Sequence, residues 1–195
     1  MTYKHLKTLD TSKDFILPCR KDNIDATQQF LPIKNPDFDG SFSTYQLLYG
    51  KGGNRIYLIG LGEEKNSAQL ENTFQKLAFE TQKYWDKSIQ VFAEDLNENE
   101  IKKAVIGLEM AQYAIGEFKS EKEKTNKTSV AFISTEPLKK ILEEGHYTGE
   151  TINKIKALVD APPNIKTPEF LGDWAEKSAK KSDYKCTILK HKELK

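Results

Sequence analysis

Arginine and cysteine are both scarce in this 195-residue sequence. Of thirty basic residues only Arg20 and Arg55 are arginine, the side chain best suited to bidentate recognition of phosphate and guanine. With a net charge of +1, this composition argues against nucleic acid as a partner. Cys19 and Cys186 are the only cysteines, too few for a secreted domain held by disulfides. We therefore expect a reducing compartment and two free thiols.

Long hydrophobic runs are missing as well. The longest apolar stretch, Ile56–Leu61, is far too short to span a bilayer. Residues Met1–Asp10 contain no apolar core of a secretory signal. The prediction is a soluble cytoplasmic protein with no membrane partner. Ten Phe, eight Tyr and two Trp supply enough apolar volume for a packed core, which excludes wholesale disorder.

The first half of the sequence begins with strands joined by short connections. A compact apolar run at Asp14–Cys19 predicts a strand, and its Pro18 favours a strand end or a sheet edge. The polar stretch Arg20–Gly40 is expected to be loop with one helical turn. The β-rich runs Ser43–Tyr49 and Arg55–Gly60 flank five residues with three glycines, which predicts a hairpin.

Helices then alternate with strands. Apolar residues three and four apart predict helices over Ser67–Trp85 and Asn99–Phe118. Short apolar runs predict strands at Ile89–Ala93 and Ser129–Ile133. This alternation predicts an α/β fold in which helices cover a mixed sheet.

The last third is mostly helical. Helices are expected over 137–145 and 148–159, and Asp160–Asn164 ends the second because two prolines follow each other there. A further helix begins at Thr167-Pro168, a capping residue followed by a proline suited to the first turn. Tyr184–Leu189 reads as a strand. A helix–strand unit with no second strand of its own suggests that the sequence is truncated.

One segment carries a specific resemblance. Ile155–Leu171 (IKALVDAPPNIKTPEFL) is similar to a stretch of the leucyl (cytosol) aminopeptidases that reads roughly A-R-x-L-V-N-x-P-x-N-x-x-T-P-x-x-L. The matching residues are Leu158, Val159, Pro162, Asn164, Thr167, Pro168 and Leu171. Ile56–Gly62 and Gly116–Ser120 resemble further segments of that family. The departures are Lys156 and Asp160, where many members have Arg and Asn.

The resemblance implies a two-domain enzyme. Residues 1–146 would form the N-terminal α/β domain, similar to a macro domain, 147–159 a connecting helix, and 160–195 the truncated start of the catalytic domain. The family forms hexamers and removes N-terminal residues, preferably Leu, from peptides with two divalent metals, zinc or manganese. Its metal motifs, G-K-G-x-T-F-D-[ST]-G-G and N-T-D-A-E-G-R-L, do not occur here. The chain should therefore contain no catalytic or metal-binding residue, be inactive alone, and take its own catalytic domain and further copies as partners.

A second hypothesis comes from two glycines. Gly60 and Gly62 follow a strand and precede a helix, a place where phosphate-binding turns occur, although the third glycine of a dinucleotide motif is missing. The alternative function is thus a free-standing, macro-like module that binds a nucleotide or ADP-ribose. His5, His146 and His191 lack zinc-site spacing, and the lysines of 177–185 read as a solvated helix face.

Overall fold

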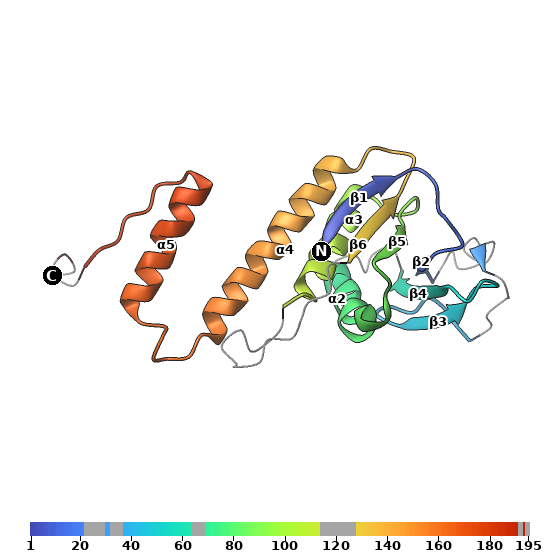
Figure 1. Cartoon of the computed structure of the whole chain (residues 1–195), viewed down its shortest axis with the longest axis horizontal. Coiled ribbons are helices and arrows are strands. Elements are labelled where there is room, and N and C mark those ends of the chain that lie inside the picture. The colour runs from blue at the N-terminus through green and yellow to red at the C-terminus, as the bar shows by residue number, and fades with distance from the viewer. Residues whose placement is uncertain (22–29, 32–36, 64–68, 114–127, 191–192, 194–195) are drawn as a thin grey trace. The chain divides into compact units, whose positions relative to one another are not determined.

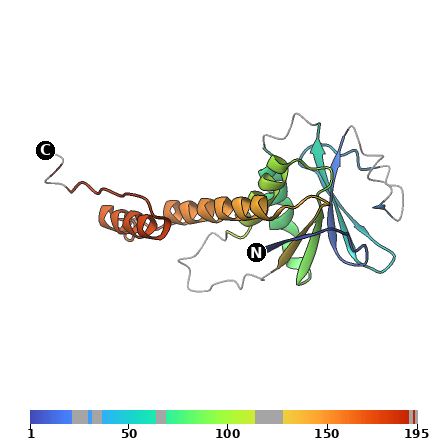
Figure 2. The same ribbon diagram turned by 90° about the horizontal axis from the view of Figure 1, so that it is seen from above.

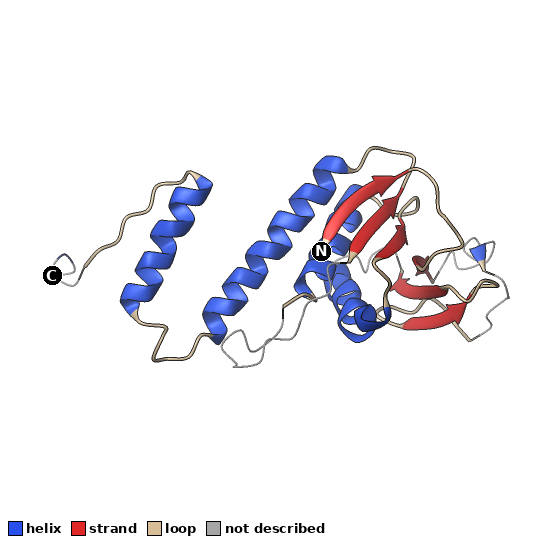
Figure 3. Cartoon of the chain, viewed as in Figure 1, coloured by secondary structure: helices blue, strands red, loops and turns tan. Residues whose placement is uncertain are grey.

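The computed structural model describes residues 1–21, 30–31, 37–63, 69–113, 128–190 and 193. Figure 1 places the elements, and Figure 3 distinguishes helices from strands. Their order is β1 (Thr2–Leu6), β2 (Phe15–Arg20), β3 (Tyr45–Tyr49), β4 (Arg55–Gly62), α2 (Leu70–Thr81), the 3₁₀ turn η3 (Gln82–Tyr84), β5 (Ser88–Phe92), α3 (Glu98–Met110), β6 (Ser129–Ile133), α4 (Lys139–Asp160) and α5 (Pro168–Ser182). The chain divides within α4 into two compact units, Met1–Lys154 and Ile155–Lys195.

The first unit is built on a six-stranded sheet with the order β1-β6-β5-β2-β4-β3. Strands β3 and β4 run antiparallel, and all other neighbours are parallel. In Figure 2 the green helices α2 and α3 lie on one side of this sheet. The predicted α/β fold with a mixed sheet and helical cover is therefore confirmed.

Both faces of the four inner strands, β2, β4, β5 and β6, are buried, by different residues. On the helical side, strand residues such as Ile16, Tyr57 and Val91 pack with α2 and α3. On the other side, Phe15 and Phe38 belong to a second apolar cluster. Successive strand residues point to opposite faces, so strands covered on both sides are apolar throughout. That is why these segments are continuous apolar runs in the sequence.

Several predicted elements are confirmed with small changes at their ends. The hairpin is present as β3 and β4, and the strand Ser129–Ile133 has the predicted bounds. Helix α2 is followed by η3, and α3 ends at Met110. Residues 67–68 and 114–118 of the predicted helices, and most of the predicted loop Arg20–Gly40, lie outside the described residues.

The position of Pro18 corrects one expectation. Its strand, β2, lies inside the sheet between β5 and β4 and not at an edge. Strand β2 pairs with β5 only at Phe15 and Ile16. On the side of β2 that faces β5, the backbone carbonyl of Asp14 accepts a hydrogen bond from the N–H of Gln90. Backbone groups alternate in direction along a strand, so the N–H that Pro18 lacks would also face β5, beyond the paired stretch. The proline therefore breaks no ladder bond.

Helix α4 corrects a second expectation, because the two predicted helices are one helix of 22 residues. Gly145 and Gly149 are both buried within it. A Cβ on Gly145 would lie 2.8 Å from the Cβ of Val105, and one on Gly149 would lie 2.5 Å from that of Glu109. The two glycines therefore let α4 approach α3 closely.

Strand β1 was not predicted from the sequence, although it completes one side of the sheet. Its residues pair in parallel with β6, from Thr2 opposite Ser129 to Leu6 opposite Ile133. Its exposure alternates between exposed and intermediate, so it has little apolar signal of its own. Long-range pairing, not local pattern, makes this segment a strand.

The second unit contains α5 and the chain that follows it. Thr167 caps α5, because its hydroxyl accepts from the N–H of Phe170, and Pro168 is in the first turn, as predicted. The predicted strand Tyr184–Leu189 is wrong: residues 184–190 have no regular secondary structure. A strand needs a neighbour for its backbone groups, and no described segment pairs with this one. Instead, Ile188 lies beside Gly172 of α5.

Candidate functional site

The residues that carry the family resemblance form the turn between α4 and α5. The carbonyl of Pro162 accepts hydrogen bonds from the N–H groups of Ile165 and Lys166, both at 2.9 Å. The ammonium group of Lys166 donates to the carbonyl of Val159 at 2.7 Å. Together with the Thr167 cap, these bonds occupy backbone groups that a helix end leaves unpaired. The interactions seen in this segment thus end one helix and start the next.

Gly60 and Gly62 lie at the end of β4, against the segment 40–44. The N–H of Gly60 donates to the carbonyl of Thr44 at 2.8 Å, and that of Gly62 donates to the carbonyl of Gly40 at 2.9 Å. A Cβ on Gly60 would overlap the carbonyl oxygen of Ser41, and Gly62 has a φ of +68°. A phosphate site needs N–H groups that point at the ligand. Both amides already have protein acceptors, and close packing accounts for the glycines.

The possible metal ligands do not come together. Within the described part of the chain, no three or more His, Cys, Asp or Glu side chains are arranged to hold a metal ion. The Nε2 atom of His5 is 2.7 Å from the carbonyl oxygen of Ser134, and Cys19 is buried in the core. Cys186 is partly exposed, and His191 lies outside the described residues.

A buried carboxylate, Glu109, joins α3, α4 and β1. Its Oε1 atom lies 3.0 Å from Nδ1 of His146 and 3.4 Å from the α-amino group of Met1. Its backbone carbonyl accepts from Nδ2 of Asn153 at 2.6 Å. Burial, followed by the Glu109 charge, raises the pKa of Tyr3 well above its ordinary value. A buried carboxylate needs such partners, so this cluster holds the part of α4 that belongs to the first unit against α3 and β1.

Sequence reasoning passed over Glu109. The only available signal was its position four residues after Val105, which places it on a packed side of α3. The histidine was considered only as a metal ligand, yet its near neighbours are one carboxylate and two aromatic rings, those of Tyr3 and Tyr147. The arrangement is that of an anchoring contact.

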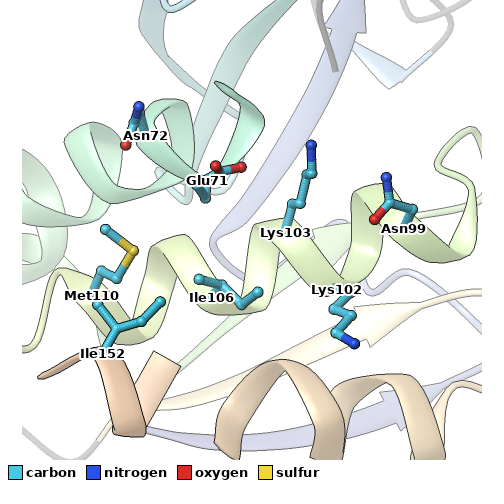
Figure 4. A pocket seen from close by; sticks show the side chains of 8 residues that line it. All are labelled: Glu71, Asn72, Asn99, Lys102, Lys103, Ile106, Met110 and Ile152. Atoms are coloured by element: carbon cyan, nitrogen blue, oxygen red, sulfur yellow. The ribbon is translucent and has the colours of Figure 1, made fainter. Parts of the chain in front are cut away.

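A shallow groove of about 360 Å³ runs along α3 between α2 and α4 (Figure 4). Ile106, Met110 and Ile152 form its apolar part. Lys102, at the other end, pairs with Glu144 at 2.9 Å. The other residues that line it are Glu71, Asn72, Asn99 and Lys103. This lining contains no Ser, Thr, Cys or His, and its one carboxylate, Glu71, is not enough to bind a metal.

Comparison with known proteins identifies cytosol aminopeptidases among the relatives of this chain. No protein-family model matches the sequence. A probable cytosol aminopeptidase of Dechloromonas aromatica is 29% identical over 83% of this chain and 36% of its own length. The corresponding protein of Bacillus subtilis is 26% identical over 73% of this chain and 31% of its own length. The chain thus spans about a third of the length of these curated relatives.

Solved structures share the fold. A tomato leucine aminopeptidase, the K354E mutant, matches 100% of this chain and 45% of its own chain, with a TM-score of 0.80 at 17% identity. The bottromycin maturation enzyme BotP in complex with Mn matches 95% of this chain and 40% of its own, with a TM-score of 0.64 at 14% identity. The resemblance to leucyl aminopeptidases, which the sequence shows at 155–171, is confirmed by these relatives and structures.

Proposed function

We propose that this chain is the N-terminal, non-catalytic portion of a metal-dependent leucyl aminopeptidase that removes N-terminal residues from peptides. The observation that carries the proposal is the coverage of the matches. They include most or all of this chain but only 31–45% of the relatives or structures described above. A chain that aligns in this way corresponds to one part of a larger enzyme.

The chemistry is assigned to the remainder of that enzyme. The described residues of this chain do not fit a metal centre, because their carboxylates, imidazoles and thiols are not clustered. Two divalent ions, zinc or manganese, would be bound by the other portion and would polarise the peptide carbonyl and activate water. The manganese in the BotP structure supports a metal of this class.

The role that we assign to this chain is assembly. The first unit is a well-packed domain, whereas the second unit exposes apolar side chains such as Val159, Leu171 and Leu189, which suit contact with another polypeptide. Its partners would be the catalytic domain of the same enzyme and further copies in a homo-oligomer, a hexamer in this family. The relatives are named cytosol aminopeptidases, and none of the described helices is both long and apolar enough to cross a membrane. We propose a cytoplasmic location.

The rival function, a nucleotide or ADP-ribose module, is not favoured by any observation. The two glycines that suggested it have their N–H groups bonded to carbonyls of the segment 40–44. The aminopeptidase proposal explains the full length of the match, including the turn 160–168, which a nucleotide module does not require.

The test begins with the transcript in its natural source. We expect the reading frame to continue past codon 195 into the two metal motifs of the family. The extended protein should hydrolyse Leu-p-nitroanilide with added Zn²⁺ or Mn²⁺, whereas the 195-residue chain should not and should bind neither ion stoichiometrically. A stop codon after residue 195, or turnover by the short chain after host aminopeptidases are removed, would refute the proposal.

A further inference from the structure

Strand β3 forms one end of the sheet, and among the described residues only β4 pairs with it. The hydrogen bonds at the two ends of the β3–β4 ladder show which residues of β3 direct their backbone groups toward β4. The N–H of Gly60 donates to the carbonyl of Thr44, and the N–H of Gly50 donates to the carbonyl of Asn54. In an antiparallel ladder, hydrogen-bonded pairs recur at every second residue. The even-numbered residues of β3 therefore bond to β4.

The odd-numbered residues present the outer edge. The backbone N–H and C=O groups of Tyr45, Leu47 and Tyr49 point away from β4. The side chains of Tyr45 and Leu47 pack on the helical side of the sheet. Tyr49 is 61% exposed, so aromatic surface accompanies the outward backbone groups.

Strand β3 itself lacks several of the features that normally prevent strand pairing. Natural edge strands are protected by charges, prolines, bulges or very short length. Strand β3 has no charged residue, no proline and no register shift against β4. The opposite edge strand, β1, differs in this respect because it contains Lys4 and His5. The edge formed by β3 is therefore less protected against pairing with another strand than the edge formed by β1.

The order of the side chains in β3 favours a second copy of the same strand as the pairing partner. The segment reads Tyr-Gln-Leu-Leu-Tyr, which is nearly the same in both directions. An antiparallel copy centred on Leu47 would place Leu47 opposite Leu47 and Tyr45 opposite Tyr49 of the second chain. Aromatic and aliphatic cross-strand pairs of this kind stabilise sheets, and a twofold axis requires such self-complementarity.

We propose that the outer edge of β3 is a homodimer interface, where two copies of the strand pair antiparallel about a twofold axis at Leu47. Each of the three outward residues supplies one donor and one acceptor, so the pairing forms about six backbone hydrogen bonds. The two sheets then become one continuous sheet. This inference does not depend on the proposed peptidase function.

The first test compares two substitutions at one position by sedimentation equilibrium. The wild-type mass should rise from 22.3 kDa toward twice that value with concentration. Tyr49→Pro should dimerise at least about tenfold more weakly than Tyr49→Ala, because both lose the ring but only proline also removes the outward N–H. Equal far-UV spectra and melting midpoints for the two variants show that the fold is intact.

The second test examines the register in a Cys186→Ser background. In this register, Leu47→Cys brings two thiols to the twofold axis, where hydrogen-bonded residues have Cα atoms about 5.5 Å apart, within disulfide range. Mild oxidation should cross-link Leu47→Cys, whereas Gln46→Cys, which faces Leu48 of the second chain, should stay uncross-linked. A protein that is monomeric at every concentration overturns the proposal. So does a dimer that Tyr49→Pro leaves unchanged or a cross-link that forms equally at both positions.

Discussion

Gly107 allows the close contact between helices α3 and α2, and Gly107→Ala tests it. A Cβ at this position would overlap the carbonyl oxygen of Glu71 and lie 3.0 Å from the backbone N of Gln75. Both atoms belong to the backbone of α2, so no side-chain rotation relieves the overlap. The two helices would have to separate, although the residues between them, such as Leu77 and Leu108, are fully buried.

Two effects of opposite sign set the magnitude. Alanine favours a helix interior over glycine by about 1 kcal/mol. Overpacking a well-packed core typically costs about 1–3 kcal/mol, and a clash with backbone belongs near the upper end of that range. We therefore expect the free energy of unfolding to fall by about 1–2 kcal/mol. For a unit of this size, that loss lowers the melting midpoint by roughly 2–8 °C.

The assay is urea unfolding followed by the fluorescence of Trp85, which is 6% exposed and belongs to the first unit. A Trp174→Phe background removes the signal of the second unit. Gly172→Ala in α5 is the matched control, because its new Cβ would meet only the flexible end of Ile188 at 3.3 Å. Helicity at 222 nm should stay equal or rise in that control. A Gly107→Ala protein as stable as the wild type would show that the α2–α3 contact is not set by this glycine.

Three further predictions follow from other parts of the chain. ADP-ribose should give no measurable heat of binding, since the amides of Gly60 and Gly62 are occupied; a micromolar dissociation constant would contradict this. Limited proteolysis should cut first within Asp160–Asn164 and leave a core that ends near Val159; equal resistance of 160–195 in a monomeric protein would count against that boundary. Burial raises the pKa of Tyr57 to about 12, whereas tyrosine in the unfolded chain ionises near 10. Rising pH between these values should therefore favour unfolding of the wild type more than of Tyr57→Phe, and equal pH slopes of unfolding would refute the assignment.

The sequence pattern correctly predicted the helices and strands that are stabilised mainly by interactions among residues close in sequence. The strand Ser129–Ile133 is a short apolar run covered on both faces, and the β3–β4 hairpin is marked by its glycine turn. Helix α5 begins where Thr167 and Pro168 suggested, because capping acts over three residues. In each case the controlling interaction is close in sequence.

Elements that depend on distant partners were not predictable in the same way. Strand β1 exists because it pairs with residues more than 120 positions later, beginning with Thr2 and Ser129. Residues 184–190 have a strand-like composition but no neighbouring strand, and they remain irregular. The helices predicted over 137–145 and 148–159 are one helix, and the surface of α3 requires the small residues Gly145 and Gly149 within it. The composition of a segment allows it to form a helix or a strand, and tertiary contacts determine whether it does so.

The resemblance to a peptidase rests on backbone geometry and not on chemistry. Pro162 ends a helix and accepts two backbone hydrogen bonds, and Thr167 caps the next helix, so these residue types are needed for the turn itself. A turn of this kind constrains its sequence tightly, because few residues can stop one helix and start another within eight positions. The contacts observed in this segment, from Pro162, Lys166 and Thr167, are made to the backbone of the segment and of the two helix ends. For the same reason the segment supports a shared architecture, while peptide hydrolysis has to be tested on a protein that contains the metal motifs.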